Sequence, residues 1–397
     1  MSRWGREDSK LLLPWRTALR PAHWVLAIFV VTAAFSVTHG TLVVDGWHAH
    51  DSEDKDFFDY DARNVHTWSD CFTKRGLWPG LYRPLSTNLY FHAGNAVFGP
   101  SLECYHAINI TLMLISGVLL FRLSAFLLGP VWSLLPAALF MTRQAHVELP
   151  LAVSEAQILL ATVLVLLGLC LFVAGRGAGR PALVWASLVP MLLAFLSKES
   201  ILVVPLGLVF FGLLFDTRRH VRRYALVVGF AVLYGALLMA VLRPRVAGTD
   251  TTFAYDASPA NVLQNVSATV LVFSNSLASP RDAMLFPRRV DALKLSLPIQ
   301  ATVVALAVLA VAFLLVNRRL RGCLIRELRV VAFGILLFLV SAAPYAVFAN
   351  RMSMRYSYAP HLGLALAGGA AVRLLVHPLV SRVSRRWRGR HALDGGR

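Results

Sequence analysis

The sequence predicts an all-α polytopic membrane protein, a bundle of about ten transmembrane helices with a large first outer loop. Composition is the first observation: of 397 residues, 57% are hydrophobic and only 15% are charged, with a mean hydropathy of +0.61. A soluble domain is about 45–50% apolar and about 25% charged. The second observation is that apolar runs close to the ~20 residues a helix needs to cross a bilayer recur along the chain, separated by polar segments.

Ten apolar runs are interpreted as spans. In chain order they cover about residues 23–44, 105–127, 130–145, 151–174, 182–197, 200–215, 224–242, 298–316, 330–348 and 358–376. The run 130–145 is short, so we expect it to be tilted or to end in a cavity. The stretch from Ala260 to Leu277 is apolar enough for the membrane interface, but asparagines, a glutamine and serines interrupt it, and it is not counted as a span.

Charge predicts the orientation. Arginine-rich segments at 1–22, 175–181, 216–223, 317–329 and the C-terminal tail all fall on one side of a ten-span topology, which marks that side as cytoplasmic. We therefore expect a cytoplasmic segment 1–22, a transmembrane domain 23–376 with outer loops at about 45–104 and 243–297, and a basic cytoplasmic tail 377–397. Both termini are expected in the cytoplasm, and the membrane is expected to be a bacterial inner membrane.

The net charge of +18 would suggest nucleic-acid binding in a soluble protein. Here the arginines cluster between and beyond apolar runs, as topology signals do, and no nucleic-acid-binding module is visible. Nucleic acid is therefore excluded as a partner, and membrane lipid is the expected environment. Of the four cysteines, Cys71 and Cys104 fall in the same outer loop, where a disulfide and two free thiols both remain open.

The polar interval from Asp45 to Tyr105 sets carboxylates among aromatic residues, a mixture typical of a site at an interface. Within it, Asp59 and Asp61 flank Tyr60. A carboxylate there could take a proton from an attacking hydroxyl group or bind a divalent cation through hard oxygen ligands. The alternative is a solvated acidic loop on the outer side of the membrane.

Two further pairs lie at predicted outer ends of spans. His146 and Glu148 follow the third span, where they could bind a metal ion or orient an acceptor. Lys198 and Glu199 join two apolar spans, and ionisable residues at membrane depth usually face a bundle interior or a cavity. An internal Lys–Glu pair, or a lysine reaching to the interface, is the structural alternative.

Arg351 and Arg355 lie at the head of the last span, on the outer side, against the general bias of arginines toward the cytoplasm. A phosphate at the outer interface would explain them, because a guanidinium matches phosphate oxygens bidentately. Pairing with the acidic first loop is the structural alternative.

Five short motifs occur in order along residues 20–376 and together resemble the C-type (GT-C) integral membrane glycosyltransferases. The closest branch is the one of protein O-mannosyltransferases and transmembrane-and-tetratricopeptide proteins, although no tetratricopeptide repeats are present here. The motifs are the acidic pair around Tyr60, Tyr82-Arg83-Pro84-Leu85 with Tyr105-His106-Ala107-Ile108-Asn109, His146-Val147-Glu148, Leu196-Ser197-Lys198-Glu199, and Arg355-Tyr356-Ser357-Tyr358-Ala359-Pro360.

The resemblance implies a GT-C-like bundle that transfers a sugar, with inversion, from a polyprenyl-phosphate donor to a glycan, lipid or protein acceptor on the extracytoplasmic face. The family's acidic residues are usually adjacent, whereas here a tyrosine separates them. The implied roles are catalysis by Asp59 or Asp61, binding of the donor phosphate by Arg355, Lys198 and Arg351, and lining of the acceptor site by His146, Glu148, Glu199, Arg83 and Tyr82. A divalent cation remains open, with Asp59, Asp61, His146 and Glu148 as its ligands if one binds.

Two other interpretations compete with this one. A transporter or flippase of a lipid-linked substrate could place Lys198 and Glu199 in its pathway. It would often show inverted repeats and helices broken near the midplane, and neither is seen in the sequence. A catalytically inactive relative is the other alternative, because the acidic pair is split.

Overall fold

The computed structural model describes residues 20–45, 51–74, 83–143, 146, 148–198, 200–201, 205–215, 229, 233, 257–274, 321–347 and 354–394. Regular structure in these residues is helical throughout, and no strand occurs among them. The expected spans at 224–242 and 298–316, and most of the outer loop 243–297, lie outside them.

Five helices carry segments long and apolar enough to cross a membrane. They are α3 (Pro21–Asp45), α7 (Leu102–Leu128), α10 (Ala156–Gly177), α18 (Arg321–Ala346) and α19 (Tyr358–Asp394). The apolar segments run over Pro21–Gly40, Leu102–Leu128, Val153–Gly177, Ile325–Ala346 and Tyr358–Val376. The prediction of an all-α, membrane-embedded protein is therefore confirmed, and these five segments coincide with the first, second, fourth, ninth and tenth predicted spans.

The other apolar helices in the described part of the chain are shorter. They are α8 (Leu134–Met141), the consecutive α11 (Pro181–Ala186) and α12 (Leu188–Ser197), and α13 (Pro205–Phe215). α8 has eight residues where the sequence predicted a short or tilted span, which at 1.5 Å per residue is about 12 Å, less than half a bilayer core. The described residues thus show five helices of spanning length, and they do not show ten.

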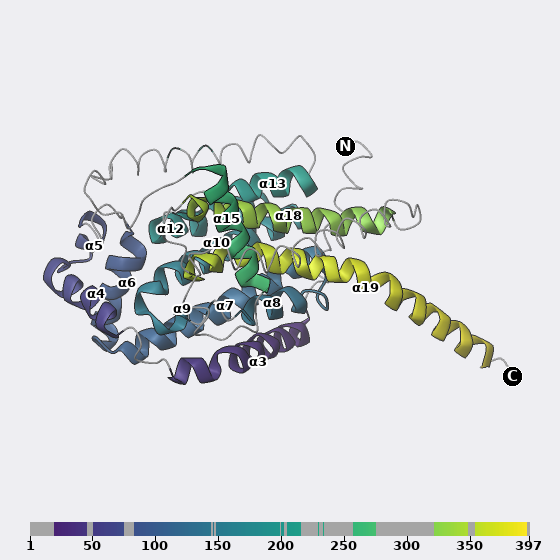
Figure 1. Ribbon diagram of the computed structural model, residues 1–397, viewed down its shortest axis with the longest axis horizontal. Coiled ribbons are helices and arrows are strands. Elements are labelled where there is room, and N and C mark those ends of the chain that lie inside the picture. The colour runs from purple at the N-terminus through teal and green to yellow at the C-terminus, as the bar shows by residue number, and fades with distance from the viewer. Residues whose placement is uncertain are drawn as a thin grey trace.

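The bundle has two distinct ends (Figure 1). We call the end that carries α4 (Asp51–Asn64), α5 (Asp70–Thr73) and α6 (Tyr90–Phe98) the loop end. We call the opposite end, from which the C-terminal part of α19 projects, the tail end. At the tail end, Arg326 of α18 and Arg373 of α19 donate to the carbonyl oxygens of Leu127 and Leu128, at 2.8 and 2.5 Å, so α18 begins beside the end of α7.

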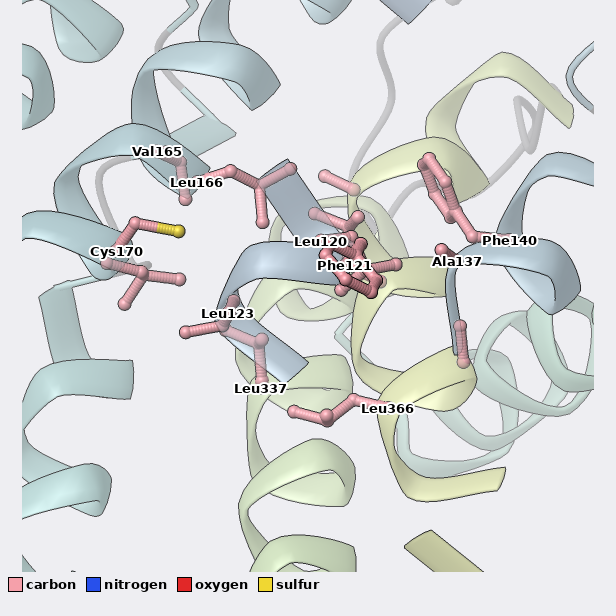
Figure 2. Close-up of a cluster of buried hydrophobic side chains, with 14 of the residues drawn as sticks. Leu120, Phe121, Leu123, Ala137, Phe140, Val165, Leu166, Cys170, Leu337 and Leu366 are labelled. Carbon is pink, nitrogen blue, oxygen red and sulfur yellow. The ribbon is translucent and has the colours of Figure 1, made fainter. Parts of the chain in front are cut away.

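Close packing of apolar side chains from α7, α8, α10, α18 and α19 forms the core, shown in Figure 2. Leu120, Phe121 and Leu123 of α7 are fully buried at its centre. Lipid tails are as apolar as these side chains, so van der Waals packing and polar contacts hold such helices together.

Small residues bring α18 and α19 into backbone contact. A Cβ atom added to Gly334 of α18 would lie 2.6 Å from the carbonyl oxygen of Gly363 and 2.7 Å from the backbone nitrogen of Ala367, both in α19. Real Cβ atoms essentially never come that close to backbone, so the two helices can approach only because Gly334 and Gly363 carry no side chain.

Gly334→Ala is expected to lower the thermal unfolding midpoint of the detergent-purified protein, because the added methyl group must push α18 and α19 apart. Overpacking of this kind costs about 1–3 kcal/mol. Gly40→Ala in α3 is the matched control, since a Cβ there meets nothing within 4 Å and brings the same gain in helix propensity. Equal midpoints for the two variants would contradict the close contact.

Candidate functional site

The segment between α3 and α7, which was predicted to be the first outer loop, is largely helical where the structure describes it, and an aromatic cluster fixes α4 on the bundle. Phe58 of α4 packs against Phe91 of α6 and Tyr105 of α7, with ring centroids 5.6 and 5.0 Å apart. Val153 completes the cluster. Residues three apart share one face of a helix, so the contact of Phe58 also turns Asp61 inward.

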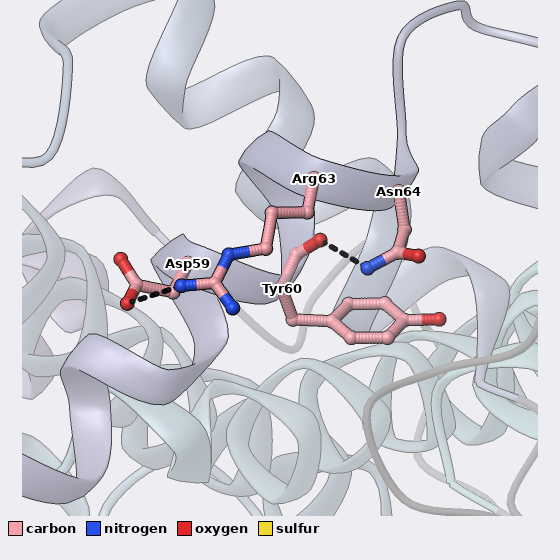
Figure 3. Close-up of polar contacts among 4 residues, drawn as sticks. All are labelled: Asp59, Tyr60, Arg63 and Asn64. Carbon is pink, nitrogen blue, oxygen red and sulfur yellow. Dashed lines mark hydrogen bonds and ion pairs between the residues drawn. The ribbon is translucent and has the colours of Figure 1, made fainter.

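The two candidate catalytic carboxylates lie on different faces of α4, one exposed and one buried. The Asp59 side chain is 67% exposed and pairs with Arg63 one turn later, at 3.4 Å (Figure 3). In the same turn, Asn64 donates to the carbonyl oxygen of Tyr60 at 2.9 Å. Asp61, in contrast, is only 4% exposed. Residues two apart on a helix do not face each other, so Asp59 and Asp61 cannot act together on one bound group.

The Asp61 side chain accepts a hydrogen bond through only one of its two carboxylate oxygens in the described residues. The Asn95 side chain donates to its Oδ2 atom at 3.1 Å. Tyr105 donates its hydroxyl proton to the carbonyl oxygen of Phe91 at 3.2 Å, with the Oδ1 atom of Asn95 at 3.4 Å. The other oxygen of Asp61, Oδ1, is buried and accepts no hydrogen bond from the residues that the structure describes.

Burial raises the pKa of Asp61, because a charged carboxylate is poorly solvated there. The hydrogen bond from Asn95 and the charges of His92 and His66 act in the opposite direction and are weaker. A carboxylate with a raised pKa and one free oxygen has the properties of a general base.

A six-residue π-helix, η2 (Pro84–Leu89), connects this region to the bundle. Ser86 donates its hydroxyl proton to the carbonyl oxygen of Ser197 at 2.5 Å. Arg83 hydrogen-bonds the side-chain oxygen of Gln157 in α10. Asn88 donates to the carbonyl oxygens of Cys71 and Lys74, at 3.1 and 3.2 Å. Arg83, which was expected to line the acceptor site, thus contacts α10, whereas Ser86 and Asn88 of η2 join α12 and α5.

Lys198 follows α12 directly and is buried, with 6% exposure. Its Nζ atom lies 5.9 Å from the ring centroid of Tyr356, in η9 (Met354–Ser357). Tyr356 stacks on Tyr345 of α18 at 4.9 Å, and the Tyr345 hydroxyl group hydrogen-bonds Ser200 at 2.6 Å. Lys198 therefore lies beside η9, the segment that contains Arg355, and a phosphate site shared by these two residues stays a prediction.

Several predicted site residues cannot be placed. Tyr82, Glu199 and Arg351 lie outside the described residues. Arg355 and Glu148 are described by their backbone only. Their roles stay predictions.

His146 lies inside the bundle, between Phe140 and Tyr358. Its Nε2 atom is 2.9 Å from Nδ1 of His361, and Nε2 of His361 is 3.2 Å from the carbonyl oxygen of Thr269. Since a carbonyl oxygen only accepts, His361 carries its proton on Nε2, and His146 donates to its Nδ1. Burial lowers the pKa of His146 well below its usual range, so this histidine is neutral.

The structure has no metal cluster among the described residues, where no three His, Cys, Asp or Glu side chains lie close enough to hold an ion. Asp61 and His146, two of the four ligands considered, have separate sets of partners. Cys71 and Cys104 are free thiols, which decides between the two alternatives that the sequence left open.

Sequence reasoning missed Asn95, Gln157 and His361. Asn95 lies one turn after Phe91 on the face of α6 that meets the aromatic cluster, but its pairing with Asp61 spans 34 positions. His361 carried a usable signal, because a histidine within an apolar span is rare without a function or a partner.

Comparisons of the chain with protein-family models, with curated proteins and with solved structures gave no significant match.

The stability of the protein should depend on pH through Asp61. Its pKa is raised in the folded state, so the stability present below the usual pKa of a carboxyl group is lost as pH rises through the raised value. Asp61→Asn cannot ionise. The unfolding midpoint of this variant relative to wild type is therefore expected to increase from about pH 3 to about pH 8.

Asp59→Asn is the matched control, because an exposed ion pair contributes little to stability. The measurement is a series of thermal unfolding curves of the three proteins at each pH. If the difference in unfolding midpoint between Asp61→Asn and wild type did not change with pH, ionisation of Asp61 would not destabilise the folded protein, and the prediction would be wrong.

Proposed function

We propose that the protein is a membrane glycosyltransferase that transfers a sugar from a polyprenyl-phosphate donor to an acceptor hydroxyl group, with inversion, on the extracytoplasmic face. The observation that supports this most is the placement of Asp61 and Lys198. Both are ionisable and buried, and both lie at the loop end on segments that η2 joins. Buried ionisable groups at a membrane surface are costly and are typical of functional sites.

In this proposal, Asp61 is the general base. Its Oδ1 atom accepts the proton of the acceptor hydroxyl group as the oxygen of that group attacks the anomeric carbon. The bond from the anomeric carbon to the phosphate oxygen breaks in the same displacement, so the configuration inverts. Asn95 holds Oδ2 and so determines which oxygen receives the proton. The raised pKa brings Asp61 nearer to neutral pH, where a general base is most efficient.

Lys198 supplies positive charge for the departing polyprenyl phosphate. Tyr356, which lies near Lys198 and stacks on Tyr345, is proposed to lie at the depth of lipid head groups, where tyrosines are enriched in membrane proteins. A lipid-linked donor would reach Lys198 with its phosphate while its chain stays in the bilayer. Arg355 and Arg351 are proposed to complete the phosphate site, on the resemblance to the family.

Transfer of radiolabelled sugar from a series of polyprenyl-phosphate sugars, by protein in lipid nanodiscs, tests the proposal. Asp61→Asn is expected to reduce turnover by roughly 10²–10⁴-fold, the usual contribution of a positioned general base. Asp59→Asn should stay within a few-fold of wild type, because Asp59 points to solvent and pairs with Arg63.

Full activity in Asp61→Asn would remove Asp61 from the mechanism. Absence of transfer with every donor, together with donor-dependent flux in proteoliposomes, would favour the transporter interpretation. Donor binding without transfer or flux would favour the inactive relative.

Lys198→Ala is expected to raise the KM for the donor by about 10- to 100-fold, as a hydrogen bond to a charged group is worth roughly 1.5–3 kcal/mol. The effect on kcat should be smaller, because the base is intact. Lys74→Ala is the control, since Lys74 is an exposed lysine of the same end. An unchanged KM in folded Lys198→Ala would mean that Lys198 does not contact the donor.

A further inference from the structure

Arg122 is a half-buried charged residue of α7. Thr111 and Ile115 are exposed on this helix, and Arg122 follows Ile115 by seven residues, so it lies on the same face two turns later. The neighbouring helix α3 is exposed at Val25 and Phe29, with 69% exposure each. Arg122 is six residues from the end of α7, about 9 Å from the tail end at 1.5 Å per residue.

Two aromatic rings orient the guanidinium group. Its central carbon lies 4.5 Å from the ring centroid of Phe126, one turn closer to the tail end, and 5.4 Å from that of Trp24 in the first turn of α3. The guanidinium therefore lies near these two rings and close to the tail end, where a long cationic side chain can reach from membrane depth to the interface. Tryptophan is itself enriched at that depth.

Both aromatic rings lie within cation–π distance of the guanidinium, and neither of them carries an acceptor oxygen or a negative charge. Among the residues that the structure describes, none accepts a hydrogen bond from Arg122, and no carboxylate forms an ion pair with it. Arg20, which directly precedes α3, is exposed and adds a second positive charge at the start of that helix. The N-terminal end of a helix also carries partial positive charge.

We propose that Arg122, Trp24 and Phe126 form a binding site for the phosphate group of an anionic phospholipid at the tail end. The planar N–H fork of arginine matches two phosphate oxygens. Cation–π contacts attract the guanidinium without neutralising it, so its charge remains for the phosphate. The site faces the bilayer between α3 and α7, at the end opposite Asp61, and it does not depend on the proposed transferase activity.

The test measures the thermal unfolding midpoint of the full-length protein in maltoside micelles. Phosphatidylglycerol is added to one sample, and phosphatidylcholine with the same acyl chains to another. A ligand that binds the folded state raises the midpoint by mass action. Phosphatidylglycerol is expected to raise the midpoint of wild type by several degrees more than phosphatidylcholine does, and inorganic phosphate at the same concentration is expected to have no effect.

Arg122→Gln should lose this difference between the two lipids, whereas Arg63→Gln, which removes an exposed arginine at the loop end, should keep it. Arg122→Lys preserves the charge and hence the fold, but it lacks the fork, and it should lose at least half of the difference. Bound lipid phosphorus per protein provides a second readout that does not depend on stability.

Three results would overturn the proposal. One is an equal response to phosphatidylglycerol in wild type and in Arg122→Gln or Arg122→Lys. Another is a wild type that responds equally to both lipids, which would mean that no anionic headgroup is selected. The third is an equal response to inorganic phosphate, which would assign the site to free phosphate.

Discussion

The hydrogen bond from Ser86 to the carbonyl oxygen of Ser197 joins the polar first loop to the apolar bundle. Ser197 is the last residue of α12, and the carbonyl groups in the last turn of a helix have no partner within the helix. In an apolar environment such a group is costly unless another residue satisfies it. By donating to this carbonyl, η2 ends α12 at Ser197, so Lys198 leaves the helix at a defined place.

The same π-helix, η2, also connects the region of Asp61 to the bundle through α5. Asn88, two residues after Ser86, donates to the carbonyl oxygen of Cys71 and holds α5. Burial, and to a lesser extent the negative charge of Asp61, raise the pKa of the Cys71 thiol. Ser86 and Asn88 of one π-helix thus link α5 to the end of α12, next to Lys198, through backbone carbonyl groups. Helices of this type occur frequently at functional sites.

Prediction from the sequence was accurate where length and hydropathy determine the structure. The runs 105–127 and 358–376 match Leu102–Leu128 and Tyr358–Val376 within a few residues, because an apolar run of membrane length has one stable form in lipid. Hydropathy also identified the run that became α8 as too short. It could not find the bend that separates α11 from α12, and the prediction of ten spans rested on runs of which only five form spanning helices in the described residues.

For the site, the sequence narrowed the choice to Asp59 and Asp61 but could not decide between them. Their types and spacing are compatible with either orientation of α4, and the contact of Phe58 with Phe91 and Tyr105 sets that orientation. His146 was identified from its neighbour Glu148, whereas its actual partner, His361, is 215 positions away. Partnerships of this length depend on how helices pack, which local pattern does not encode.

α7 connects the two ends of the molecule and shows two ways of keeping a polar group in an apolar bundle. In its first turn, Tyr105 donates its hydroxyl proton to the carbonyl oxygen of Phe91 in α6 and lies beside the side chain of Asn95. Asn95 in turn donates a neutral hydrogen bond to Asp61, whose pKa is raised by burial. Near its end, Arg122 rests on aromatic rings. Lys198 also lies near an aromatic ring, with its Nζ atom 5.9 Å from the ring centroid of Tyr356.

The two solutions have different consequences for binding. A carboxylate partner would cancel the charge of a cation, whereas a ring contributes about 0.5–2 kcal/mol of attraction and leaves the net charge in place. A cation that rests on a ring can therefore still attract a phosphate. An acid whose charged form is disfavoured by burial can still accept a proton. The aromatic contacts of Arg122 thus leave its charge in place, and the neutral amide of Asn95 leaves Asp61 able to accept a proton.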